Sequence, residues 1–413
     1  MEAALVDELG HRGESRTDQG AWETRIVADR PDHDPADGGP TPDLTPRARE
    51  WAATMAGHGS GSVRHAHADT HADVGNTDIA DREVREARED DQLAPGATRA
   101  AGAGSRAVEE DPDPWRTCFE RDRDRIVHGT AFRRLAGKTQ VFVFPDDHQR
   151  TRLTHALEVA QVATSIARAC RLNVALAEAI ALGHDCGHGP FGHASEDALA
   201  PFVEGGYDHA TWGADVVLAP LNLCTETLDG IRNHSWSRPA PSTPEGEVVS
   251  WADRIAYLCH DFEDAVLAGV VGPDDLPDIV AERCGRDRRQ QLHAFISAVV
   301  HATAESGTVG MHDDLAEALT AFRAFNYERI YLRDESRRQA VVVDRLLTAL
   351  VEWYRADPAR LVAEGRPIDD STDIVREAVS FVGGMTDRFA HERALANLGW
   401  DAADLPIGLE THT

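Results

Sequence analysis

The sequence predicts an all-α catalytic region that follows a long, largely disordered N-terminal extension. Three observations lead to this prediction. Apolar residues recur at helical spacing from about residue 110 onward, β-type alternation is scarce, and residues 1–90 carry Asp-, Pro-, Gly- and His-rich runs without a sustained period. We therefore expect an extension over residues 1–90 and one helical domain over residues 91–405.

The extension includes the runs RPDHDPADGGPTPDLTPR and GHGSGSVRHAHADTHADVGNTD. Such a segment buries too little apolar surface to offset the conformational entropy that ordering would remove. Short helices are expected only at 47–55 and 81–91. The histidines of the HAHADTH tract, His65, His67 and His71, could bind a transition metal, but we favour a compositionally biased stretch without function.

Composition and charge argue against several classes of protein. The 413 residues carry 42 basic and 71 acidic side chains, a formal net charge of −29, which argues against strong binding to duplex nucleic acid. No apolar run approaches the roughly 18 residues of a membrane span, and the N-terminus lacks the apolar core of a secretory signal. The six cysteines form no CxxC pair, so we expect reduced thiols in a cytoplasmic protein.

Helices are expected in order along the catalytic region. Residues 120–137 have an amphipathic pattern, with Ile126 and Phe132 apolar and an RDRDR run facing solvent. The VFVF run at 141–144 is β-like and ends at Pro145. Further helices are expected at 152–171, 173–185, 194–203, 209–218, 225–233, 250–267, 290–304, 314–330, 336–355 and 371–398.

Two of these helices place a histidine on the inner face. His155 shares a face with apolar residues at steps of 4, 3, 4 and 4, and His184 lies at the inner end of the next helix. A lone buried histidine is usually a core residue. His184, however, is followed at once by Asp185, where glycines break the helix and polar groups can converge. The pair therefore points to a site.

A further carboxylate, Asp253, lies on the helix expected at 250–267. One interpretation is a capping box with Ser250, in which the carboxylate serves the helix N-terminus. The other is a pocket wall, since Asp253, Tyr257 and Asp261 follow at i, i+4 and i+8. Two imidazoles and two carboxylates suit Mn, Fe, Co, Ni or Zn, whereas Mg prefers an all-oxygen set.

The pattern His155, His184-Asp185 and Asp253 resembles the HD superfamily of metal-dependent phosphohydrolases. Longer segments are similar to successive signatures of the dGTPase-like deoxynucleoside triphosphate triphosphohydrolases. They are DPWRTCFERDRDRIVHGTAFRRLAGKTQVF, RTRLTHALEVAQVATSIAR, ALGHDCGHGPFGHASEDAL, GGYDHATWGADVV and EGEVVSWADRIAYLCHDFEDA. The resemblance spans about residues 90–400 and implies an HD-type helical bundle.

The resemblance implies a role for individual residues. The ligands of a divalent metal would be His155, His184, Asp185 and Asp253, and His193 with Glu196 would form the catalytic pair. Phosphate contacts would come from Arg152, His188, His209 and Arg254, and deoxyribose contacts from Tyr257, Asp261 and Gln140. Simpler interpretations remain: surface ion pairs for the two arginines, a helix end for Gln140 and a helix N-terminal residue for His209. The segment GHGPFGHASE departs from the usual GHPPFGHAGE at Gly189 and Ser195.

The implied activity is hydrolysis of a deoxynucleoside triphosphate (dNTP) to a deoxynucleoside and inorganic triphosphate, with Mn, Mg, Co, Ni or Fe as the metal. The resemblance also implies a homo-oligomer and a dNTP activator. Two alternatives stay open. One is an HD phosphohydrolase acting on a nucleoside monophosphate or a cyclic nucleotide, and the other is a regulatory HD protein that senses nucleotides.

Overall fold

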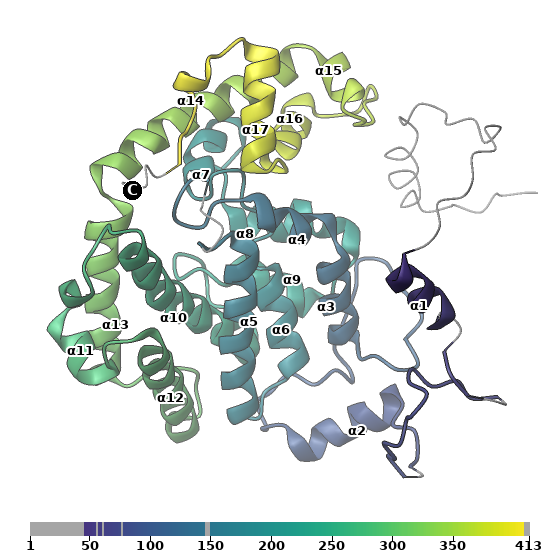
Figure 1. Ribbon diagram of the computed structural model, residues 1–413. Helices are drawn as coiled ribbons and strands as arrows, with labels where there is room; N and C mark the ends of the chain where they lie inside the picture. Colours follow the sequence, from purple (N-terminus) through teal and green to yellow (C-terminus); the bar gives the residue numbers. More distant parts are fainter. Residues whose placement is uncertain (1–44, 55–56, 60–61, 76, 145–148, 409–413) are drawn as a thin grey trace, which may run out of the picture. The chain divides into compact units, whose positions relative to one another are not determined.

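The computed structural model describes residues 45–54, 57–59, 62–75, 77–144 and 149–408 (Figure 1). These described residues form seventeen α-helices and no β-strand, which confirms the all-α prediction. Two compact units, Met1–Asp78 and Ile79–Thr413, divide the chain. Much of the extension predicted to be disordered, residues 1–44, lies outside the described residues. Within the first unit, α1 spans Pro46–Thr54 and His65, His67 and His71 are exposed.

The second unit begins with α2, and its helices run to the C-terminal region. Their bounds are α2 Arg82–Gln92, α3 Cys118–His128, α4 Thr130–Arg134, α5 Arg152–Ala169, α6 Val174–Gly183, α7 Ala194–Leu199, α8 His209–Trp212, α9 Thr225–Asn233, α10 Pro244–Leu267, α11 Asp278–Cys284, α12 Arg288–Ser306, α13 Asp313–Asn326, α14 Asp334–Ala356, α15 Pro358–Ala363, α16 Ile374–Gly383 and α17 Asp387–Arg393. No helix in the described part of the chain is long and apolar enough to cross a membrane.

Several local predictions differ from the structure, among them the helix expected over 371–398, which ends at Gly383 and resumes at Asp387. The helix expected over 120–137 is divided at Gly129, which ends α3 and precedes α4. The VFVF run is irregular, and the nearby pairing is a single bridge between Thr139 and Thr151. The capping role considered for Asp253 is wrong, because α10 begins at Pro244 with Thr243 as its N-cap. Asp253 therefore lies in the middle of a long helix.

Two apolar cores organise the second unit. In the first, α5 and α6 lie side by side and pack with α3 and α10 through buried residues such as Val159, Ile180 and Ile255 (Figure 1). In the second, α14 and α16 pack against α7 through residues such as Leu350 and Val379. Each core buries apolar surface from helices far apart in sequence, the main favourable contribution to folding.

The loop between α6 and α7 joins these two cores. Cys186, near its start, is buried in the first core, and Phe191, near its end, is buried in the second. The loop also carries Asp185, His188 and His193. Both cores therefore hold a segment on which four of the predicted site residues lie, His184 included.

Candidate metal and catalytic site

Two buried histidines and two carboxylates converge where α5, α6 and α10 meet. His155, on α5, places Nε2 at 3.1 Å from Asp253 Oδ1 and 3.9 Å from Asp185 Oδ2. His184 directly follows α6, and its Nδ1 donates a hydrogen bond of 2.6 Å to the Ala181 carbonyl. A carbonyl can only accept, so Nδ1 carries the proton and Nε2 presents a lone pair. That Nε2 lies 3.4 Å from Asp185 Oδ1 and 3.7 Å from Asp253 Oδ1.

The donor set fits a divalent cation. Protein ligands lie about 2.0–2.2 Å from such an ion, which places neighbouring ligand atoms about 3–3.5 Å apart. The spacings among His155, His184, Asp185 and Asp253 fall close to this range. His184 Nε2 is also buried without a hydrogen-bond partner, an arrangement that is costly unless something else satisfies the atom. The ligand atoms of His155, His184 and Asp253 all lie within 4.8 Å of one another, and Asp185 adjoins them, so the fold brings the four expected ligands together.

The charges around these groups keep the carboxylates ionised. Burial alone would raise the pKa of Asp185, but Arg152 and the neighbouring histidines hold that pKa well below its usual range. Burial likewise opposes the charged form of Asp253, yet its hydrogen bond with His155 and the neighbouring imidazoles lower its pKa. Ionised carboxylates in a buried place need cationic partners. A bound cation would supply one.

Another histidine, His234, joins this group. It follows the last residue of α9 as His184 follows the last residue of α6, and its Nδ1 likewise donates to the carbonyl three residues earlier, that of Ile231, at 2.8 Å. Ligand atoms of His184, Asp185 and His234 all lie within 4.8 Å of one another. Burial and the nearby imidazoles lower the pKa of His234 to about 4, so its ring is neutral at physiological pH.

A second cluster centres on one carboxylate oxygen. Glu196 Oε1 lies 2.9 Å from both His193 Nδ1 and His209 Nδ1, and 3.6 Å from His188 Nδ1. The rings of His188 and His209 stack with their centroids 3.7 Å apart. Burial works against ionisation of Glu196, but the hydrogen bonds from His193 and His209 lower its pKa. The His193 side chain is 75% exposed, while His188 and His209 are buried.

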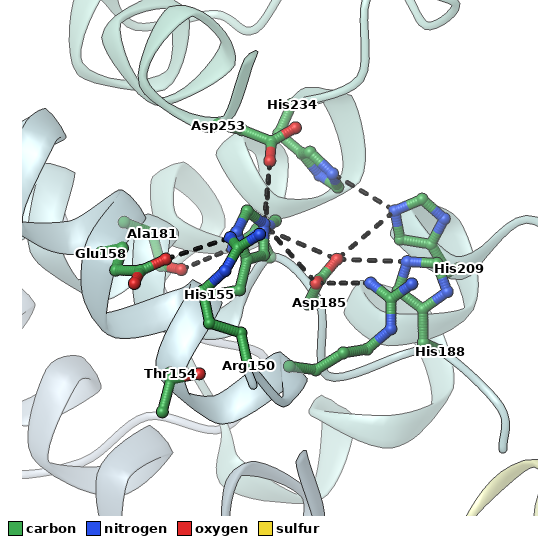
Figure 2. A network of polar contacts seen from close by, with 12 residues as sticks. Arg150, Thr154, His155, Glu158, Ala181, Asp185, His188, His209, His234 and Asp253 are labelled. Carbon is green, nitrogen blue, oxygen red and sulfur yellow. Dashed lines mark hydrogen bonds and ion pairs between the residues drawn. The ribbon is translucent and has the colours of Figure 1, made fainter. Parts of the chain in front are cut away.

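Asp185 connects the two clusters. Figure 2 shows it between His155 and Asp253 on one side and His188 and His209 on the other. Its Oδ1 is 3.2 Å from His188 Nε2, and its Oδ2 accepts a 2.6 Å hydrogen bond from Arg152 Nη1. Arg152 is buried, and its Nε and Nη2 have no hydrogen-bond partner. The surface ion pair considered for Arg152 is therefore wrong, and the guanidinium keeps two donors for an anion.

The remaining predicted residues lie farther along α10 and on the loop before α5. Arg254 stacks over Trp236, with its guanidinium carbon 3.3 Å from the ring centroid, and the pKa of Tyr257 is raised by burial. The Asp261 carboxylate is held by Arg150 and by the hydroxyl of Tyr331. Gln140 presents a buried Oε1 without a hydrogen-bond partner.

Sequence reasoning missed several residues that the fold brings here. A cleft of about 240 Å³ is lined by Trp236, Arg254 and Arg323, among others, so it contains two guanidinium groups. Arg323 lies on α13, 69 residues from Arg254. Nothing in its local pattern indicates that position. Arg150, by contrast, stands two residues before Arg152 within the recognised RTRLTH segment and could have been chosen.

Comparisons with known proteins agree with this geometry. The HD domain model matches residues 152–258, and the phosphohydrolase-associated domain model matches residues 309–394. The chain is 40% identical over 316 residues to the deoxyguanosinetriphosphate triphosphohydrolase-like protein of Caldanaerobacter subterraneus subsp. tengcongensis, covering 75% of this chain and 93% of that relative. The chain belongs to the deoxyguanosinetriphosphate triphosphohydrolase-like family.

Other members of this family are similarly close. The protein of the same name from Desulfatibacillum aliphaticivorans is 39% identical over 337 residues, with 76% of this chain and 96% of that protein covered. One from Clostridium perfringens is 38% identical over 296 residues, with 68% and 86% covered. The residues matched by the HD domain model include every predicted site residue from Arg152 to Tyr257. Membership of this family and the HD domain identify the protein as a hydrolase.

Proposed function

We propose that this protein hydrolyses a dNTP to a deoxynucleoside and inorganic triphosphate in a metal-dependent reaction. The observation that carries the proposal is the proximity of two separate groups. The set His155, His184, Asp185 and Asp253 has the chemistry and spacing of metal ligands, and the pair His193–Glu196 adjoins it without belonging to it. One group suits an ion and the other suits proton transfer.

When bound, a divalent ion would supply Lewis-acid chemistry, polarising a phosphoryl oxygen and activating water for attack at the α-phosphorus. The two unpartnered donors of Arg152 would bind a phosphate oxygen by charge-assisted hydrogen bonds. His188 and His209, whose stacked rings lie between Asp185 and Glu196, would line the same phosphate. These contacts neutralise charge as the bond to the 5′-oxygen breaks.

His193 is proposed as the general acid for the leaving 5′-oxygen. Its Nδ1 is engaged by Glu196, which fixes the orientation of the ring, and its exposed side chain leaves Nε2 as the nitrogen that can reach a substrate. On the sugar side, Asp261 would accept a hydrogen bond from the 3′-hydroxyl. Arg150 and Tyr331 already orient its carboxylate, while Tyr257 and Gln140 would complete the deoxyribose contacts.

The number of cationic side chains favours a triphosphate over a monophosphate or cyclic nucleotide. Arg152 lies next to the proposed metal ligands, and Arg254 and Arg323 line the nearby cleft. A substrate with a single phosphate group would leave at least one of these guanidinium groups without an anionic partner. Direct comparison tests the choice: each dNTP, each dNMP and a cyclic nucleotide, with Mn or Mg, followed by chromatography of the products. Hydrolysis confined to monophosphates or cyclic nucleotides would reject the proposal.

Self-association and activation by a second dNTP belong to the same proposal, and both rest on the resemblance to the family. Sedimentation with and without dNTP measures the first. The second is measured by the rate for one dNTP in the presence of another. A monomer with a rate independent of the second dNTP would contradict both.

A further inference from the structure

The only lysine of the chain ties the C-terminal helices to the loop of the catalytic site. Lys138 is 3% exposed, and its Nζ donates hydrogen bonds to the His188 carbonyl and, at 2.9 Å, to the Gly383 carbonyl. Gly383 is the last residue of α16, inside the phosphohydrolase-associated segment. His188 lies on the loop between α6 and α7. One buried ammonium group therefore connects two segments nearly 200 residues apart.

A buried carboxylate makes a second connection at the same place. Asp387, the first residue of α17, is 3% exposed. Its Oδ2 accepts hydrogen bonds from Thr139 N at 2.8 Å and Thr139 Oγ1 at 2.5 Å, and its Oδ1 accepts one from Phe191 N at 2.7 Å. Thr139 directly precedes Gln140, and Phe191 stands two residues before His193. Asp387 thus holds both loops that present site residues.

The loop before His193 has a backbone that needs such support. Phe191 and Gly192 have φ angles of +64° and +65°, and the left-handed region is unfavourable for phenylalanine. A non-glycine residue keeps this conformation only where its surroundings enforce it. Here the Phe191 ring is buried in the second core and its N–H is bound by Asp387.

The same loop also presses against Arg152. A Cβ atom at Gly192 would lie 2.7 Å from Arg152 Nη2 and 3.0 Å from the Thr139 carbonyl oxygen. Close approach of the Gly192 backbone therefore sets where the free donors of Arg152 can lie. Any shift of the loop would move this guanidinium together with His193.

We infer that Asp387 is a positioning residue, through which the phosphohydrolase-associated segment fixes the loops bearing Gln140 and His193. Asp387 itself touches neither the proposed metal ligands nor the proposed general acid. It acts through Thr139 and Phe191. The inference rests on the proposed function for the roles of Gln140 and His193, but the contacts that it invokes are independent of any substrate.

The chain offers a matched control for this carboxylate. Glu245, on α10, is fully buried and accepts the same kinds of donor: Thr98 N at 3.1 Å, Asn173 N at 2.8 Å and Thr98 Oγ1 at 2.7 Å. Asp387→Ala and Glu245→Ala each leave two backbone N–H groups and one threonine hydroxyl without an acceptor. We expect both to lower thermal stability, because unsatisfied buried donors are costly in either place.

Only Asp387→Ala should affect the site. We expect kcat to fall on the order of 10²-fold, the effect of misplacing a reacting group by about 1 Å, with bound metal unchanged. Glu245→Ala should keep its kcat at a temperature where both variants are folded. Equal kcat values in the two variants would overturn the inference. If either variant fails to fold, Thr139→Val and Thr98→Val form a milder pair, each losing one hydroxyl contact, with the same contrast in kcat expected and equal values again contradicting it.

Hydrogen exchange separates this inference from the proposed function. In Asp387→Ala the amides of residues 138–140 and 188–193 should exchange faster than in the wild type, and in Glu245→Ala they should not. This readout needs no substrate. A wild-type protein inactive on every dNTP would reject the proposed function while leaving the exchange result decisive for positioning. Unchanged exchange in these two loops would overturn the inference even if dNTP hydrolysis is demonstrated.

Discussion

Replacing His193 with alanine tests whether proton transfer and metal binding are separate tasks of this site. The side chain is 75% exposed and its one polar partner is Glu196, at 2.9 Å. Removing it should therefore change the free energy of unfolding by no more than about 0.5 kcal/mol, as for other exposed positions. The four proposed metal ligands keep all their contacts, so metal content should stay at the wild-type value.

The rate should fall much further than the stability. A positioned general acid contributes roughly 10²–10⁴-fold, or about 2.7–5.4 kcal/mol of activation free energy. Glu196→Ala should be at least as damaging, because the same carboxylate oxygen also binds His209 Nδ1 at 2.9 Å. Single-turnover kinetics at saturating dNTP measure the chemical step, and mass spectrometry of the purified variants measures the metal.

His312 provides the control. It is a half-exposed histidine 3.2 Å from Glu305, so His312→Ala removes a similar pair without removing any of the proposed catalytic groups. We expect this variant to match the wild type in rate, metal content and stability. A His193→Ala protein that loses its metal, or one whose single-turnover rate stays within a few-fold of the His312→Ala rate, would refute the assignment.

Three further outcomes follow from the structure. His184→Ala or Asp185→Ala should lose bound metal and activity together, and normal metal content in either variant would contradict the ligand assignment. Deletion of residues 1–78 should leave metal content and basal hydrolysis intact, because the second unit begins at Ile79, whereas an insoluble or inactive product would show that the removed residues are needed. Burial lowers the pKa of Lys138 from 10.5 to about 7, so the unfolded chain binds more protons between these values and the free energy of unfolding should rise with pH across that window. The free energy of unfolding of the wild type minus that of Lys138→Met, measured with denaturant, should therefore rise from pH 7 to pH 9. A difference that does not change with pH would contradict this reasoning.

Local patterns in the sequence predicted the part of the site that depends on helix geometry. His155 could be placed on an inward face because its apolar neighbours follow at helical spacing, and His184 because glycines end its helix. From the sequence alone, Asp253 could lie either at the start of a helix or within one, because the serine three residues earlier is a typical N-cap residue. The structure settles it by beginning α10 at Pro244, six residues before that serine.

The contacts that sequence could not predict are those between distant segments. Asp387 carries no local signal, and its partners Thr139 and Phe191 lie 248 and 196 residues away. Arg323 reaches the cleft beside Arg254 only because α13 packs on α10. His234 was also missed, because only packing between distant helices brings it to the site. Like His184, it directly follows a helix and donates from Nδ1 to the carbonyl three residues earlier. Periodicity reports which face of a helix is buried, but not which other segment covers it.

In the proposed reaction water attacks the α-phosphorus of a dNTP, the 5′-oxygen leaves, and inorganic triphosphate is released in one piece. Hydrolysis in water enriched in ¹⁸O tests it most directly, with the products separated and weighed by mass spectrometry. We predict one ¹⁸O atom in the inorganic triphosphate and none in the 5′-hydroxyl of the deoxynucleoside. Label in the deoxynucleoside, or products consisting of a deoxynucleoside monophosphate and pyrophosphate, would contradict the claim.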